Sequence, residues 1–132
     1  MNKCAIICVD DESIILESLK QQLKKHFLTT YIYELASSAE EAMEILDELI
    51  LDGVMVLIIV SDWLMPGIRG DDFLIEVHKR YPQIIKVMLT GQADDESIQK
   101  ARDSANLYAC LSKPWNENEL IEIIKKGLDK NE

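Results

Sequence analysis

Val60-Ser61-Asp62-Trp63-Leu64-Met65-Pro66-Gly67 is the stretch that decides the fold of this chain. It completes an apolar run over residues 54–60 that is rich in β-branched side chains. A short run of this kind, closed by a Pro-Gly turn, is typical of a strand that is buried on both faces. Asp62 is the first charge after the run, so the sequence predicts a carboxylate at the carboxyl end of a central strand.

The composition indicates one domain of ordinary size and argues against some functions. The 132 residues are 48% hydrophobic, which suits a single domain with its own core. The formal net charge of −10 argues against direct nucleic-acid binding, because phosphate contacts require a basic surface. No apolar run is long enough for a signal peptide or a membrane span, so we expect a cytoplasmic protein without membrane contacts. The three cysteines lack metal-ligand spacing, so we expect neither a disulfide framework nor a zinc site.

Strand-like and helical patterns alternate five times along the chain. The segments predicted as strands are residues 4–9, 31–36, 54–60, 84–89 and 107–111. Helical spacing of apolar residues follows each strand, and every strand–helix–strand unit is long enough for a parallel crossover. We therefore predict an α/β three-layer sandwich with a five-stranded parallel sheet. The helix over residues 94–106 has the thinnest apolar stripe, so we expect it to be the least firmly packed.

Two local signals refine this prediction around the second strand. Glu34 interrupts the strand pattern and suggests that residues 31–36 lie at an edge of the sheet. Ser38 and Glu41 then match a capping box, which predicts that the second helix begins there. Asp52-Gly53 is expected to end that helix.

Polar side chains stand directly after four of the five predicted strands. They are Asp10 and Asp11, Asp62, Thr90 and Lys113. Carboxyl ends of parallel strands share one edge of the sheet, where ligands of such folds bind. Three converging carboxylates repel one another unless a hard cation such as Mg²⁺ is present. The hydroxyl and the ammonium suit phosphoryl oxygens, and Asp62 can act as a nucleophile, so the set indicates magnesium-assisted phosphoryl chemistry.

Four motifs make the chain resemble the receiver domain of two-component response regulators. They are Val9-Asp10-Asp11-Glu12, Ser61-Asp62-Trp63-Leu64-Met65-Pro66-Gly67, Leu89-Thr90-Gly91 and Ser112-Lys113-Pro114. The resemblance makes residues 1–132 one receiver domain with a core of about residues 3–128. It implies a flavodoxin-like, doubly wound (βα)5 sandwich with strand order 2-1-3-4-5, as in the chemotaxis regulators of this family. It also implies a cis peptide bond between Lys113 and Pro114.

The resemblance implies a role for each residue of the site. Asp62 would accept the phosphoryl group of a histidine kinase or phosphotransfer protein. Asp11, Asp62 and the backbone carbonyl of Leu64 would bind Mg²⁺ or Mn²⁺ directly, and Asp10 would act mostly through a metal-bound water. The residues that would contact the phosphoryl group are Leu64, Thr90, Gly91 and Lys113.

The same resemblance implies a switch and not a turnover enzyme. The domain would catalyse only its own phosphotransfer and autodephosphorylation. Phosphorylation would change a protein–protein surface that controls an output domain or an effector protein, and homodimer formation is one expected output.

Some positions depart from the family pattern or leave alternatives open. The family usually carries Tyr or Phe three residues before the lysine, where this chain has Cys110. Alternation along the strand predicts that Tyr108 shares the face of Cys110 and partly replaces the aromatic ring. Leu64 and Gln92 occupy positions that tune hydrolysis of the phosphoaspartate in the family. Trp63 is expected at the rim of the site, either packed on the loop or controlling access of the kinase.

Two other functions are compatible with the motifs. The first is a degenerate receiver that acts only as a binding module, which Cys110 keeps open. The second is a magnesium-dependent phosphatase that uses Asp62 as its nucleophile. Such phosphatases often place an acidic residue two positions after the nucleophile, where this chain has Leu64, and no nearby histidine can replace it.

Overall fold

A computed structural model of the chain, which describes residues 3–91 and 95–129, contains a five-stranded parallel sheet with strand order β2-β1-β3-β4-β5. The strands are β1 (Cys4–Val9), β2 (Ile32–Ala36), β3 (Met55–Asp62), β4 (Ile85–Thr90) and β5 (Ala109–Ser112). This architecture confirms the predicted doubly wound sandwich and its strand order. Because all strands run the same way, their carboxyl ends lie at one edge of the sheet.

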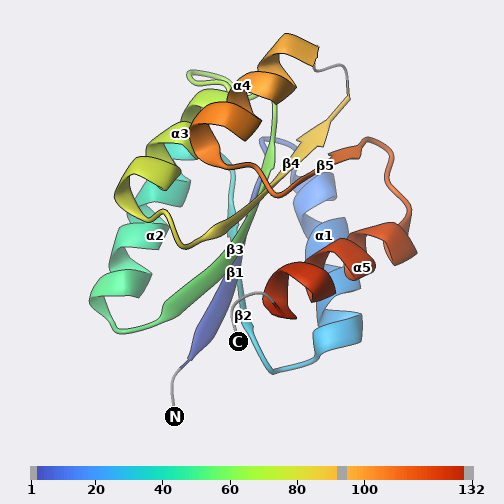
Figure 1. Cartoon of the computed structure of the whole chain (residues 1–132). Helices are drawn as coiled ribbons and strands as arrows, with labels where there is room; N and C mark the ends of the chain where they lie inside the picture. Colours follow the sequence, from blue (N-terminus) through green and yellow to red (C-terminus); the bar gives the residue numbers. More distant parts are fainter. Residues whose placement is uncertain (1–2, 92–94, 130–132) are drawn as a thin grey trace.

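Helices cover both faces of the sheet. They are α1 (Ser13–Phe27), α2 (Ala39–Leu51), α3 (Gly70–Arg80), α4 (Asp95–Ala105) and α5 (Glu117–Asp129). Figure 1 shows α1 and α5 on one face of the sheet and α2, α3 and α4 on the other. Within the described ranges, no helix combines the length and the apolar character that crossing a bilayer requires.

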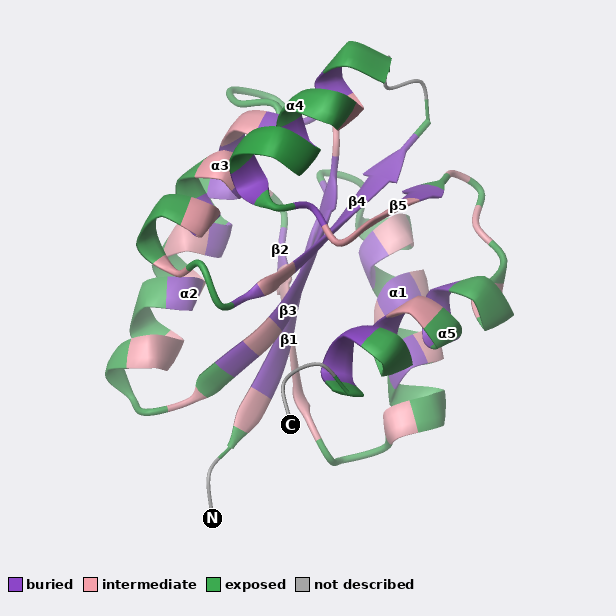
Figure 2. Ribbon diagram, in the orientation of Figure 1, coloured by how far each residue is buried: buried purple, intermediate pink, exposed green. Residues whose placement is uncertain are grey.

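The central strand β3 contributes to two apolar cores. Ile58 and Val60 pack against α1 and α5, whereas Ile59 packs against the helices of the opposite face. All three side chains are fully buried, and Figure 2 shows the inner strands as mostly buried ribbon between helices whose outer sides are exposed. Burial on both faces is the physical reason why this segment is an unbroken apolar run and not an alternating one.

The edge strand β2 and the cap of α2 match their sequence signals with one shift. Ser38 Oγ accepts the backbone N–H of Glu41 at 3.1 Å, as a capping box requires. The Glu41 carboxylate, however, accepts the N–H of Ser37 at 2.9 Å and not that of Ser38. Gly53, with φ +81°, follows the end of α2 in the left-handed conformation that glycine adopts at little cost.

Two strand boundaries differ from the prediction by two residues, and the other differences are of one residue. Strand β3 continues through Asp62, because Asp62 still pairs with Leu89 of β4. Strand β5 begins at Ala109 and not at residue 107, and its pairing with β4 runs from Ala109 to Ser112. The phosphoacceptor candidate is therefore the last paired residue of the central strand, which restricts its backbone.

Helix α4 buries small side chains. The buried residues of α4 are Ser97, Ala101 and Ala105, while Ile98 is only partly buried. Small residues allow α4 to lie close to α3, its main neighbour, but they remove little apolar surface from water. The structure describes this helix from Asp95 onward, and Asp94, where the prediction began, lies outside the described residues.

Candidate functional site

The carboxyl edge of the sheet brings together the polar residues predicted from the sequence. Asp62 and Thr90 end β3 and β4, while Asp10 directly follows β1 and Lys113 directly follows β5. An open cavity of about 840 Å³ lies at this edge, and its lining includes Asp11, Asp62 and Lys113. Parallel pairing of adjacent strands brings residues as distant in the sequence as Asp11 and Lys113 to one cavity.

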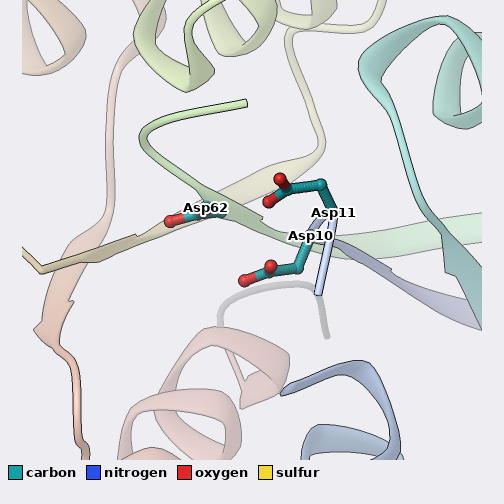
Figure 3. Close-up of side chains that lie close together, drawn as sticks. All are labelled: Asp10, Asp11 and Asp62. Atoms are coloured by element: carbon teal, nitrogen blue, oxygen red, sulfur yellow. The ribbon is translucent and has the colours of Figure 1, made fainter. Parts of the chain in front are cut away.

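Three carboxylates converge at this edge of the sheet. One carboxylate oxygen each from Asp10, Asp11 and Asp62 lies within 4.8 Å of the others. Figure 3 shows the three side chains close together at the ends of β1 and β3, with their carboxylates turned to the same side. Asp10 is fully buried and Asp62 is 6% exposed, whereas Asp11 faces solvent. The group therefore combines two desolvated charges with one that is accessible from outside.

A hard divalent cation fits this set of donors. Mg²⁺ prefers oxygen ligands at about 2 Å, so its directly bound ligands are separated by no more than about 4 Å. Mg²⁺ usually binds one or two protein carboxylates and keeps several waters. A spread of up to 4.8 Å among the three oxygens suits two direct ligands and a third that acts through water.

Lys113 supplies the positive charge at the floor of the cavity. Its Nζ lies 2.8 Å from Asp10 Oδ2 and 3.2 Å from Asp62 Oδ1. Burial opposes the charge of this ammonium, but its bonds to Asp10 and Asp62 outweigh burial and hold its pKa above the ordinary value. The Lys113 backbone N–H also donates to the carbonyl oxygen of Thr90 at 2.8 Å, and the Lys113–Pro114 bond is cis, as predicted.

The surroundings of the Asp62 carboxyl disfavour its ionised form. Burial raises its pKa above the ordinary value, and the neighbouring Asp10 carboxylate raises it further. Lys113 and the backbone N–H of Trp63 oppose the rise only in part. The ionised form of Asp62 is therefore costly at this position, and an added cation reduces that cost.

Glu12 belongs to the cavity although its role was not predicted. Its side chain is exposed and lines the cavity, and its Oε1 lies 3.8 Å from Lys113 Nζ. The backbone N–H of Glu12 donates to Asp10 Oδ1 at 2.8 Å, which holds the Asp10 side chain in place. The sequence signal for Glu12 was its position next to Asp10-Asp11. The prediction included Glu12 in that motif but gave it no role in the site.

Cys110 contacts Thr90, but Tyr108 does not replace the missing aromatic ring. Cys110 Sγ lies 3.7 Å from Thr90 Oγ1, on the face of the sheet that α3 and α4 cover. Tyr108 packs on the opposite face, near Gly127 of α5. The predicted shared face was wrong because Tyr108 precedes β5, so the alternation of a regular strand does not apply to it.

The rim of the cavity is largely apolar. Leu64 is 61% exposed and lines the cavity together with Trp63 and Gly91. Trp63 is half-buried and packs against the core, and its indole N–H is buried without a hydrogen-bond partner among the described residues. Gln92, predicted to influence hydrolysis, lies outside the described residues.

The comparisons with known proteins point to a single family. A family model described as the response regulator receiver domain matches residues 6–125. The hydrogenase transcriptional regulatory protein HoxA of Cupriavidus necator is 30% identical over 127 residues, which are 96% of this chain and 24% of that protein. This chain thus spans about a quarter of the length of the curated relatives it matches first.

Solved structures agree with this assignment. The signal receiver domain of an HD domain-containing protein from Pseudomonas fluorescens Pf-5 has a TM-score of 0.84 and 28% identity, covering 98% of this chain and 97% of that one. A CheY-like response regulator receiver domain protein from Methanospirillum hungatei JF-1 has a TM-score of 0.81 and 31% identity, covering 98% and 96%.

Proposed function

The chain belongs to the response regulator receiver domain family, and from this premise we propose that Asp62 accepts a phosphoryl group from a phosphohistidine donor. The observation that carries the proposal is the arrangement around Asp62: Asp10 and Asp11 within 4.8 Å, and the Lys113 ammonium at 3.2 Å. The Asp62 side chain lines an open cavity, so a donor protein can approach it.

In the proposed step, an Asp62 carboxylate oxygen attacks phosphorus while the bond from phosphorus to the donor's imidazole nitrogen breaks. The leaving imidazole keeps the electron pair of that bond and takes up a proton. Charge develops on the phosphoryl oxygens, and Lys113 stabilises it from the floor of the cavity. Thr90 ends β4 and Gly91 follows it, and the two would contact the phosphoryl oxygens through a hydroxyl and a backbone N–H.

Asp10, Asp11 and Asp62 would hold Mg²⁺ or Mn²⁺ together with the backbone carbonyl of Leu64. Such a cation, when bound, lowers the repulsion between carboxylates and phosphoryl oxygens. The raised pKa of Asp62 supports this assignment, because a carboxylate that repels its neighbour gains from a shared cation.

The product would act as a switch on partners. Relatives in the family include a transcriptional regulator and a sensor kinase, so the family is used in two-component signalling with different attached domains. We expect a histidine kinase or a phosphotransfer protein as donor, and an output domain or effector protein as the responder. Self-association into a homodimer stays a prediction, as do cytoplasmic location and a single receiver domain over residues 1–132.

Acetyl phosphate, a small phosphoryl donor, tests the proposal when added with Mg²⁺ and followed by intact-protein mass. Wild type is expected to gain one phosphoryl group, and Asp62→Asn is expected to gain none. Asp52→Asn, which removes an exposed carboxylate beyond the end of α2, is the matched control and should behave like wild type. No adduct on wild type would favour the degenerate receiver. Steady turnover of small phosphomonoesters would favour the phosphatase, against which the apolar Leu64 argues.

A further inference from the structure

Four side chains of alternating charge form a ring beside the phosphoacceptor loop, the segment over residues 63–69 that connects β3 to α3. Arg69 Nε and Nη2 donate to the two carboxylate oxygens of Asp71 at 3.1 and 2.7 Å. Lys100 Nζ of α4 lies 2.6 Å from Asp72 Oδ1 and 3.7 Å from Asp71 Oδ2. Arg69 Nε closes the ring at 3.9 Å from Asp72 Oδ2. Two cations and two anions thus join the loop before α3, the first turn of α3, and α4.

Asp71 is the most constrained member of the ring. Its side chain is fully buried, whereas those of Arg69, Asp72 and Lys100 are each about 45% exposed. A buried carboxylate is stable only when charges and hydrogen bonds compensate its lost hydration. The two-pronged Arg69 contact supplies that compensation from the loop, so displacement of the loop would leave a buried charge poorly compensated.

The start of α3 also touches the backbone of Asp62. The N–H of Gly70 donates to the carbonyl oxygen of Trp63 at 2.5 Å, which closes the loop over residues 63–70 on itself. A Cβ atom at Gly70 would clash with the backbone oxygen of Asp62, so only glycine fits against this peptide. The start of α3 is therefore packed at Gly70 against the peptide that carries Asp62.

We propose that the ring of Arg69, Asp71, Asp72 and Lys100 couples the phosphoacceptor loop to α4, with Asp71 as a positioning residue for Asp62. Asp71 holds the loop through Arg69, and Lys100 extends this hold to α4. The fully buried side chains of α4 are small and remove little apolar surface from water, so the ionic contact of Lys100 adds to a modest apolar attachment. A bond between Lys100 and Asp72 that raises the pKa of the ammonium agrees with a formed contact.

The first test is amide hydrogen exchange on the unphosphorylated protein, which does not depend on the proposed phosphotransfer. Lys100→Met is expected to raise exchange about fivefold in α4 and also in residues 63–69, by loss of an ionic contact. Arg102→Met, which removes another cation of α4, is the matched control and should change neither segment. Lys100→Met should add no further exchange to the loop once Asp71→Asn is present. Faster exchange in α4 alone would overturn the coupling.

The second test separates positioning from mere structural support and rests on the proposed function. Asp71→Asn is expected to lower the maximal rate of phosphorylation by acetyl phosphate about tenfold, because a small displacement of the nucleophile is costly. The apparent affinity for Mg²⁺ should stay within about twofold, since Asp71 is outside the set of converging carboxylates. Equal loss of rate and Mg²⁺ affinity, or an unchanged rate, would contradict the role of Asp71.

The outcomes of the two tests are independent of each other. If wild type gains no phosphoryl group, the proposed function is wrong, while the exchange test still decides the coupling. If Asp71→Asn does not fold, Lys100→Met and its Arg102→Met control decide it, because both substituted side chains are solvent-accessible.

Discussion

Lys86 lies within the sheet and Lys113 lies at its carboxyl edge, and the two ammonium groups have opposite electrostatic surroundings. Lys86 of β4 is 1% exposed, and its Nζ lies 2.9 Å from His78 Nδ1 and 3.4 Å from the carbonyl oxygen of Pro82. Neither of these partners carries a negative charge. Lys113 is partly exposed and contacts the carboxylates of Asp10 and Asp62. Among the described residues, Lys86 has no acidic partner, whereas Lys113 contacts the carboxylates of Asp10 and Asp62 at its closest approach.

The pKa values of the two lysines shift in opposite directions. Burial lowers the pKa of Lys86 to about 8. Burial also acts on Lys113, but the bonds to Asp10 and Asp62 outweigh it and raise the pKa. The comparison teaches that acidic partners, and not depth alone, decide whether a lysine of this sheet keeps its charge at low cost. It marks Lys113 as a group of the site and Lys86 as a cost to stability.

The largest difference between Lys113→Met and Lys86→Met is expected in the rate of phosphorylation. Lys113→Met is expected to lower the rate with acetyl phosphate about 100-fold, because it removes a charge aimed at the phosphoryl oxygens. Lys86→Met should leave the rate within about twofold, since Lys86 is not among the residues that line the cavity. Equal rates in the two variants would show that Lys113 has no special role.

The same two variants should change stability in opposite directions. Lys86→Met is expected to raise the free energy of unfolding by about 1–3 kcal/mol at pH 7, since one pKa unit corresponds to about 1.4 kcal/mol. Lys113→Met is expected to lower it by about 1–3 kcal/mol without divalent cations, because Asp10 and Asp62 lose their shared cation. Urea unfolding in a buffer with a chelator measures both values, and shifts of the same sign would refute the comparison.

The pH dependence of stability sharpens the account of Lys86. Its pKa is about 8 when folded and 10.5 as the ordinary value, so the unfolded chain binds more protons between these limits. Stability therefore gains from rising pH in this window, and the cost of Lys86 is fully present only below pH 8. The difference between wild type and Lys86→Met should shrink from pH 8 to 10.5. Ionisation of Cys8, whose pKa burial raises to about 12, acts equally on both proteins and cancels.

Cys110→Ala is expected to have the smallest effect. It removes a weak sulfur contact with Thr90, the residue whose carbonyl oxygen accepts the Lys113 backbone N–H. The loss should be about 0.5–1 kcal/mol of stability, with the phosphorylation rate unchanged within about twofold. Thermal unfolding and the acetyl phosphate assay check this prediction. A large loss of rate would show that the contact between Cys110 and Thr90 affects the function of Lys113.

Much of the fold was predictable because each local signal has one physical cause. An apolar run that ends in a charge and a Pro-Gly turn describes a doubly buried strand, and parallel pairing then places Asp10, Asp62, Thr90 and Lys113 at one edge. The extension of β3 to Asp62 was missed, because pairing with Leu89 depends on the neighbouring strand and not on local composition.

The remaining misses depend on contacts between distant residues. The contacts of Asp71 could not be predicted, because nothing local shows that Lys100, 28–29 positions away from the two aspartates, meets it in the ring. Tyr108 was placed on the wrong face because the start of β5 is set by its pairing with β4. Lys86 lies in a strand-like run whose pattern does not show that its ammonium is buried.

The identity of the phosphorylated residue tests the central claim most directly. After reaction with acetyl phosphate and Mg²⁺, reduction with borohydride marks an acyl phosphate, and peptide mass spectrometry locates the mark. The account predicts a mark on Asp62 alone, which Lys113→Met weakens and Lys86→Met leaves intact. A mark on Asp10 or Asp11, or no mark on a folded protein, would contradict it.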